Sequence, residues 1–210
     1  LSFSIDGMPD THDTIRGQKG AWKRTISGLR RVQSDASHIA TSIYFVVTNK
    51  NVYELTTVYD LARSYGSGFD FWPVNDAPDL YLKTPVEKEA WRSAVEHISN
   101  QDLEVAARAA YYEEGLNYHA DKKGPVRCLG LIDQYGVTYT GELLPCCVWG
   151  AEGLVVGNVF DTPLSELWVS DAVQSHRQKM YGDGCSVGCY NHSLYEFEVA
   201  TGEPFRVEKQ

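Results

Sequence analysis

Apolar residues in the first half of the chain follow two alternating spacings. Residues 20–34 and 52–65 carry apolar side chains at helical spacing, and a third helix is predicted to begin at Thr84-Pro85. Between the helices lie short runs rich in β-branched and aromatic residues, which predict strands at 1–6, 38–48 and 69–74. Strand and helix therefore alternate, and this order predicts right-handed βαβ units on a parallel sheet.

The pattern changes in the second half of the chain. A further helix is predicted over residues 103–118, and the stretch Lys122-Lys-Gly-Pro125 has the composition of a boundary. Beyond it a short helix is predicted to open on Pro163, and shorter apolar runs separated by turns predict strands at 129–133, 137–139 and 154–159. We therefore expect two domains, residues 1–124 and 125–210.

The second domain contains all of the chain's cysteines: Cys128, Cys146, Cys147, Cys185 and Cys189. Cys128 and Cys146 are the ends of a C-x12-G-x4-C stretch that includes Gly141, and the last two cysteines form a C-x3-C pair. Four thiolates suit a tetrahedral metal site, with Cys147 left over because neighbours in a strand face opposite sides. The spacing leaves an iron–sulfur cluster, a zinc ion, and free or disulfide-bonded cysteines as alternatives. A cluster is favoured, because only the second pair has the spacing of a zinc knuckle.

Together with Gly157-Asn158 and Leu164-x-x-Leu-Trp168, this cysteine spacing resembles the SPASM extension of radical S-adenosylmethionine enzymes. A full SPASM extension has seven cysteines and two auxiliary clusters. This chain lacks the C-x2-C-x5 part before Cys185, so it is more similar to the shortened variant called twitch, which holds one cluster. The resemblance implies an auxiliary [4Fe-4S] cluster, and its ligands would be Cys128, Cys146, Cys185 and Cys189.

The first domain extends the resemblance. Ser4-Ile-Asp-Gly7, followed by a stretch from His12 to Gly17, is similar to the fourth strand and its loop in the radical-enzyme barrel. The segment from Val46 to Asn51, and later Pro73, are similar to the next two units. The implied fold class is α/β: the second half of a partial (β/α)6 radical SAM barrel, followed by a small SPASM/twitch-like α+β domain. The C-x3-C-x2-C motif of the catalytic cluster is absent from this sequence, so we expect a fragment that is inactive alone.

The resemblance also implies a function for the intact protein. It would be an oxidoreductase or maturase in which a second [4Fe-4S] cluster cleaves S-adenosyl-L-methionine to a 5′-deoxyadenosyl radical. This radical takes a hydrogen atom from a peptide or small-molecule substrate, and a flavodoxin or ferredoxin supplies electrons. By match with the family, Ser4 and Asp6 help to hold S-adenosylmethionine; the alternative is that Asp6-Gly7 only makes the turn after a strand. The competing function is a non-enzymatic binding module stabilised by zinc.

Other polar residues are candidates because of their position. Ligands bind at the carboxyl ends of parallel strands, which adds Thr48, Asn49 and residues 72–76. His12 and Arg16 fall in a predicted polar loop, and hydrogen bonding or solvation there is favoured over ligand binding. The remaining candidates have simpler explanations. Asp76 is an aspartate in a predicted loop, and His97 and His176 are surface or packing residues of predicted helices. Trp72, Tyr111 and Tyr112 are most simply core aromatics.

Composition and charge limit the kinds of partner that the protein could bind. A chain of 210 residues with 43% hydrophobic residues can bury one substantial core, or one core and a small appendage. A net charge of −9 argues against nucleic acid, and no apolar run approaches the roughly 20 residues that cross a bilayer. Without an export signal, clustered cysteines indicate the cytoplasm. Because Leu1 to Asp6 already forms a predicted strand, we expect a truncated sheet edge that promotes self-association.

Overall fold

The computed structural model describes residues 1–74, 77–108, 112–113, 116, 129–132, 134–146, 155–183 and 202. The chain divides into two compact units, Leu1–Asp121 and Lys122–Gln210, and each is described by itself. Among the described residues, no helix has both the length and the apolar character that crossing a membrane requires.

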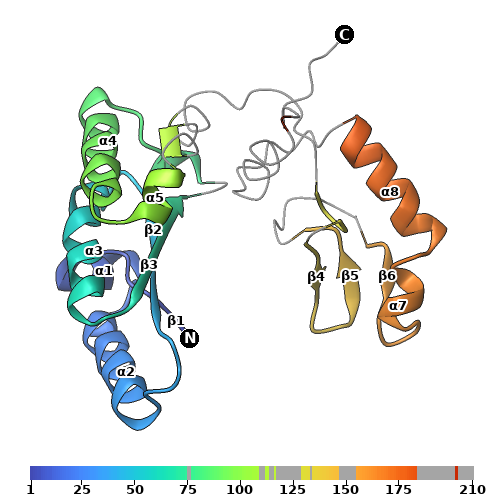
Figure 1. Ribbon diagram of the computed structural model, residues 1–210, viewed down its shortest axis with the longest axis horizontal. Helices are drawn as coiled ribbons and strands as arrows, with labels where there is room; N and C mark the ends of the chain where they lie inside the picture. Colours follow the sequence, from blue (N-terminus) through green and yellow to red (C-terminus); the bar gives the residue numbers. More distant parts are fainter. Residues whose placement is uncertain are drawn as a thin grey trace. The chain divides into compact units, whose positions relative to one another are not determined.

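The first unit contains a parallel sheet with the order β1-β2-β3 (Figure 1). Its strands are β1 (Ser2–Ser4), β2 (Ser42–Val47) and β3 (Gly68–Pro73), and Phe3 pairs with Ile43 and Phe45 with Phe71. Helices connect or follow the strands: α1 (Pro9–Ile15), α2 (Ala21–Asp35), η1 (Val52–Glu54), α3 (Leu55–Ser64), η2 (Pro78–Leu80), α4 (Pro85–Ser99) and α5 (Leu103–Ala107). The predicted order of parallel βα units is therefore confirmed.

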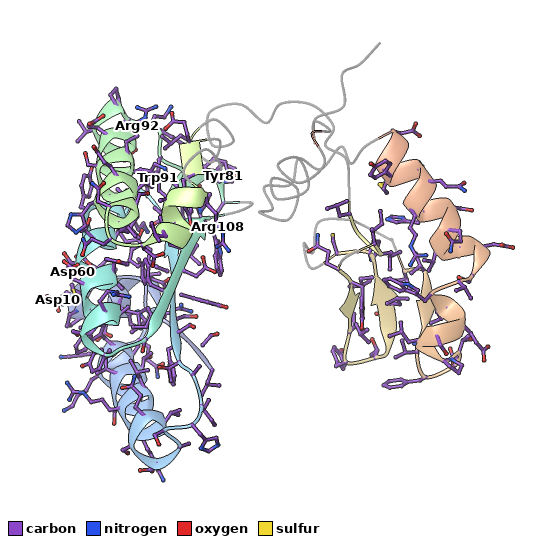
Figure 2. All side chains as sticks on the ribbon, viewed as in Figure 1. Asp10, Asp60, Tyr81, Trp91, Arg92 and Arg108 are labelled. Carbon is purple, nitrogen blue, oxygen red and sulfur yellow. The ribbon has the colours of Figure 1, made fainter. Side chains whose placement is uncertain are left out.

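The core of the first unit lies between the sheet and the helices. Alternate residues of β2 are fully buried on the helix side: Ile43, Phe45 and Val47. On β3, Phe71 packs edge-on against Trp91 of α4 and stacks on Tyr112 at 4.4 Å between ring centroids. Trp91 projects from α4 (Figure 2), and its Nε1 donates to the Tyr112 carbonyl oxygen at 3.0 Å. Tyr112 is thus a core residue, as its aromatic character predicted.

Local signals correctly located α4. The Thr84 Oγ1 accepts from the Glu87 N–H at 3.2 Å, and the Glu87 carboxylate accepts from the Thr84 N–H at 2.8 Å. This reciprocal pair is a capping box, and Pro85 occupies the first turn. Of the predicted helix at 103–118, α5 covers Leu103–Ala107, and residues 112, 113 and 116 are also helical. Its other residues after Arg108 lie outside the described part of the chain.

The predicted polar loop at residues 8–20 is wrong, because Pro9–Ile15 forms α1. The sequence of α1 lacks an apolar stripe, and polar contacts hold the helix instead. The Asp13 carboxylate accepts from the N–H groups of Gly20 and Trp22, which joins α1 to the start of α2. These two hydrogen bonds lower the pKa of Asp13.

The second unit contains a small antiparallel sheet with the order β4-β5-β6. Its elements are β4 (Gly136–Val137), β5 (Glu142–Leu144), β6 (Gly157–Asn158), α7 (Leu164–Leu167) and α8 (Asp171–Gly182). The core consists of side chains from the turn before β4, from β5, and from both helices: Leu131, Leu143, Leu167 and Val173. This arrangement follows the parallel βα units along the chain and makes the fold mixed α/β.

Several strand predictions in this unit need correction. Leu131 and Ile132 lie in a turn, so the strand predicted at 129–133 is wrong. The strand predicted at 137–139 ends at Val137, and the one predicted at 154–159 is reduced to Gly157–Asn158 within the described residues. Strand β5 was not predicted. Strands of two or three residues are too short to show an alternating pattern.

Candidate functional site

The carboxyl end of β1 is a hydrogen-bonded junction centred on Asp6, which is 3% exposed. Its N–H donates to His12 Nδ1 at 3.0 Å, and its carbonyl oxygen accepts from Asn51 Nδ2 at 3.0 Å. Its carboxylate accepts from the Val46 N–H at 3.2 Å and pairs with Arg16 Nη2 at 2.5 Å. Both carboxylate oxygens therefore have partners within the chain, and a ligand that bound Asp6 would have to share one of them.

Asn51 joins the ends of β1 and β2. It is fully buried, and its Nδ2 also donates to the Val46 carbonyl oxygen at 2.9 Å. Its Oδ1 accepts from the Thr48 N–H at 2.7 Å and from the Thr48 hydroxyl at 3.0 Å. Asn51 occupies the N-cap position of η1, but its side chain makes no cap hydrogen bond there. It organises the strand ends instead, and Thr48 is consequently buried.

His12 and Arg16 were predicted in a loop, and both lie at the end of α1 or just beyond it. His12 is 1% exposed, and its Nδ1 accepts a backbone N–H, so Nε2 carries the ring proton. Burial lowers the pKa of His12; the carboxylates of Asp6 and Asp13 oppose this shift, and Arg16 reinforces it. His12 is therefore neutral at pH 7.

A cavity of about 530 Å³ lies beside β1, α1 and α2. Its lining includes hydroxyls, guanidinium groups and one imidazole: Ser2, Ser4, Thr25, Arg16, Arg24 and His12. No acidic residue is among its described lining residues, although the chain as a whole carries a net charge of −9. Ser4 is exposed to this cavity, whereas Asp6 is not among the residues that line it. The cavity thus suits a ligand with hydroxyl and anionic groups.

The other candidates in the first unit have structural partners. Asn49 binds the segment around η2, because its N–H donates to Leu80 O and its Nδ2 to Asp79 O, both at 2.9 Å. His97 is half-exposed and lies 3.9 Å from the Asp60 carboxylate. Trp72 packs edge-on against Tyr44 at 5.1 Å between centroids. Asp76 and Tyr111 lie outside the described residues.

Of the predicted metal ligands, the structure describes Cys146 alone. It is half-buried and follows the end of β5 at Leu144 by two residues. Because the strand ends before Cys146, strand alternation does not decide between Cys146 and Cys147 as ligand. Cys128, Cys147, Cys185 and Cys189 lie outside the described residues, so their convergence on one site remains a prediction.

The glycine of the C-x12-G-x4-C stretch has a defined structural role. Gly141 closes the turn between β4 and β5 with φ +85°, a left-handed conformation that favours glycine. A Cβ at this position would lie 2.5 Å from Asn158 Oδ1 and 2.6 Å from the Phe160 ring. The turn that precedes Cys146 therefore requires glycine for both conformation and packing.

Gly157-Asn158 fixes the third strand against this turn. A Cβ on Gly157 would lie 2.5 Å from Leu167 Cδ2, so glycine allows α7 to approach β6 closely. Asn158 Nδ2 donates to the Thr140 carbonyl oxygen at 2.9 Å, and its Oδ1 accepts from the Phe160 N–H at 2.8 Å. Gly157 and Asn158, which are part of the family resemblance in the sequence, thus hold β6 against α7 and against the turn that precedes Cys146.

Arg177 was not identified from the sequence, and it anchors α8. Its Nε donates to the Leu131 carbonyl oxygen at 2.6 Å, and its Nη1 donates to the Trp168 carbonyl oxygen at 3.0 Å. Its guanidinium also lies 4.3 Å from the centroid of the Trp168 ring. One side chain therefore joins α8 to the turn after Cys128 and to the end of α7. These partners are distant in the chain, so no local pattern signals them.

His176 lies on the same helix and is buried. Its Nε2 has no hydrogen-bond partner among the residues that the structure describes. Burial, with the nearby Lys179 charge as a smaller effect, lowers the pKa of His176. His176 is therefore a packing residue, as predicted, that carries a buried polar atom.

The chain is similar to two curated proteins over most of its length. It is 27% identical over 191 residues to the AdoMet-dependent heme synthase of Methanosarcina barkeri, covering 80% of this chain and 52% of that protein. It is 31% identical over 169 residues to the PqqA peptide cyclase of Gluconobacter oxydans, covering 74% of this chain and 44% of that protein. The chain thus spans about half the length of these curated relatives.

Residues 128–190 match SPASM, described as an iron–sulfur cluster-binding domain. This stretch begins at Cys128 and includes every cysteine of the chain. The chain belongs to the radical SAM family with a SPASM iron–sulfur domain. The SPASM domain implies an iron–sulfur cluster, and thiolates are the usual ligands of such clusters. The half-buried Cys146, positioned by the hairpin of β4 and β5, fits this requirement.

The chain has a further relative over a shorter stretch. Over 61 residues it is 31% identical to the Fe-coproporphyrin III synthase of Methanosarcina barkeri, a match that covers 29% of this chain and 15% of that protein. The names of the relatives thus refer to heme, to a porphyrin and to a peptide.

Proposed function

We propose that this chain is part of a radical SAM oxidoreductase or maturase with one auxiliary [4Fe-4S] cluster. Residues 1–124 would form the second half of the (β/α)6 barrel, and residues 125–210 the cluster domain of the shortened twitch type. The SPASM match over residues 128–190 carries this proposal. The parallel βα units that precede it in the chain support it.

In the second unit, we assign the cluster ligands to Cys128, Cys146, Cys185 and Cys189. The described elements lead to two of these positions, because β5 ends two residues before Cys146 and α8 ends three residues before Cys185. Arg177 holds α8 to Leu131, three residues after Cys128. The role of these elements is to present thiolates from separate segments, and Cys147 is the cysteine left over.

In the first unit, the carboxyl end of β1 would contribute to the S-adenosylmethionine site. The Ser4 hydroxyl and the Arg16 guanidinium line the same cavity, and such groups suit the hydroxyls and the carboxylate of this cosubstrate. Asp6 would support the site by holding Arg16. When bound, S-adenosylmethionine and a second [4Fe-4S] cluster supply the radical that takes a hydrogen atom from the substrate. The role of the chain's own residues at this site would be to bind and orient the cosubstrate.

The names of the relatives suggest the class of substrate. Their names refer to a peptide and to porphyrins, so we propose a peptide or a small molecule as the substrate class. A flavodoxin or ferredoxin would act as electron donor, because clusters of this kind are reduced by one electron at a time.

Metal analysis after anaerobic reconstitution tests the proposal. We expect about four iron and four sulfide ions per chain for one cluster. Cys146→Ala should lose the visible absorbance of the cluster, whereas the matched variant Cys147→Ala should keep it. Binding of one zinc ion without iron or sulfide would instead support the zinc-stabilised binding module. Equal loss in both variants would contradict the ligand set.

A further inference from the structure

Two residues near the end of α1 hold Asp6 at different points. His12 accepts from the Asp6 N–H at 3.0 Å, and Arg16, four residues later, pairs with the Asp6 carboxylate at 2.5 Å. Residues four apart lie on the same side of a helical turn, so both reach the end of β1 together. The backbone and the side chain of Asp6 are thus fixed from one side of the cavity.

The contact with the backbone depends on the protonation state of His12. An N–H group donates to Nδ1 only when that nitrogen carries no proton. A charged imidazole carries protons on both nitrogens, and its Nδ1–H would then face the Asp6 N–H. Since His12 is 1% exposed, water has little access to replace the lost hydrogen bond.

Several charged groups surround this contact. Asp6, Asp13 and Arg16 act on the imidazole directly. From α2, Arg24 lines the same cavity. Glu54, the last residue of η1, accepts from the Met8 N–H and from the Thr11 hydroxyl, each at 2.6 Å. These two hydrogen bonds fix the turn between Asp6 and α1. Arg16 opposes protonation of His12, and Asp6 and Asp13 favour it.

We propose that His12 is a positioning residue for the cavity beside β1. Its unprotonated Nδ1 fixes the position of the Asp6 backbone, and the Asp6–Arg16 ion pair in turn fixes the position of Arg16, whose side chain is 41% exposed. The ligand class is a molecule with an anionic group that Arg16 can contact. In naming S-adenosylmethionine as that ligand, this inference rests on the proposed function. Protonation of His12 releases the Asp6 N–H and lowers the affinity for the ligand.

Backbone amide protection of Asp6, followed by NMR between pH 5 and 8 in the whole chain, tests the contact itself. Because burial lowers the pKa of His12, we expect protection of Asp6 in the wild type to fall only at a pH below the ordinary histidine pKa of about 6.5. His12→Asn keeps an acceptor oxygen but does not titrate, so its protection should be independent of pH. His12→Leu should lose protection at every pH, on the order of tenfold for one hydrogen bond. His97→Asn, a half-exposed control, should behave as the wild type.

Calorimetric titration with S-adenosylmethionine tests the consequence for binding, on the chain reconstituted with its auxiliary cluster. His12→Leu should weaken binding on the order of tenfold, and His12→Asn should restore it. Unchanged Asp6 protection in His12→Leu, or full affinity despite lost protection, would overturn the positioning role. If the wild type binds no S-adenosylmethionine while Asp6 protection behaves as expected, the cosubstrate site proposed above is wrong and the His12 contact stands.

Discussion

Gly141 combines a backbone requirement with a packing requirement. Its φ of +85° favours glycine, and a Cβ would overlap Asn158 and Phe160. We expect Gly141→Ala to lower the stability of the second unit by roughly 2 kcal/mol. Thermal unfolding followed by tryptophan fluorescence checks this, because Trp168 lies in that unit.

Gly182→Ala is the matched control for this substitution. Gly182 ends α8, has an ordinary backbone conformation, and has open space around its Cβ position. Alanine there should be neutral or stabilise by up to about 1 kcal/mol. Equal destabilisation by both variants would contradict the role assigned to the turn.

His176 places a buried base in the second unit. We expect His176→Leu to stabilise this unit by about 1 kcal/mol, because it removes a buried polar atom that has no described partner. The lowered pKa of His176 means that the folded state favours the neutral ring. The stability linked to His176 is therefore present above its unfolded pKa of about 6.5 and is lost as the pH falls.

Melting temperatures at pH 8 and pH 5.5 test this prediction. The wild type should lose more stability between the two conditions than His176→Leu does. His12 contributes a loss of the same sign in the first unit, so His12→Asn serves as a comparison. A leucine variant that is less stable at both pH values would show that His176 makes a necessary hydrogen bond.

The sequence located residues whose signals are local and missed those whose partners are distant. Cysteine spacing predicted Cys146 as a metal ligand, and position at a strand end predicted Ser4 as a cosubstrate contact; both roles stay predictions. Nothing in the sequence indicated that Asn51 would bind Asp6, which is 45 residues away, or that Arg177 would bind Leu131, which is 46 residues away. Such contacts depend on the tertiary fold, which a single sequence does not show.

At the scale of elements, length and apolar content decided which predictions were confirmed. Helices α2, α3 and α4 have 10 to 15 residues with an apolar face, and the sequence located each of them. Helix α1 is polar and has 7 residues, and β4 and β6 have 2 residues each. These short elements are stabilised by side-chain hydrogen bonds and by a neighbouring turn, so periodicity does not reveal them.

Helix α8 depends on one arginine for its position. We expect Arg177→Met to destabilise the second unit by about 2 kcal/mol, since two carbonyl oxygens lose a charged donor and Trp168 loses a cation–π contact. Urea unfolding of the variant measures this loss. Arg31→Met is the control, because the Arg31–Asp35 pair is exposed and should contribute less than about 1 kcal/mol. Equal effects would contradict the anchoring role.

At the scale of the whole molecule, β1 is an edge strand among the described residues, where it pairs with β2 alone. Unpaired backbone groups on an edge strand favour association with another chain. We expect light scattering to show a mass above that of the monomer, increasing with concentration. Ser2→Lys should shift the mass toward the monomer, because Ser2 is exposed on β1 and charges protect sheet edges. A monodisperse wild-type monomer would contradict this expectation.

The parallel βα order was predictable because several independent elements agreed on it. The number of strands and the (β/α)6 barrel were implied by resemblance, and the three described strands of the first unit neither extend nor exclude them. In the second unit, the family was recognisable from cysteine, glycine and asparagine positions although its strands were not. A position that requires one residue type is easier to recognise in a sequence than a strand of two residues.

The bridge that Asn51 makes between β1 and β2 also bears on the order in which the protein assembles. A chain synthesised from its amino end presents Asp6 long before Asn51, which is 45 residues later. Closing a loop of this length costs conformational entropy before any contact compensates for it. The end of β1 can therefore reach its final form only after β2 and the turn beyond it are in place. The cavity beside Ser4 can therefore form only once the chain has been synthesised at least as far as Asn51.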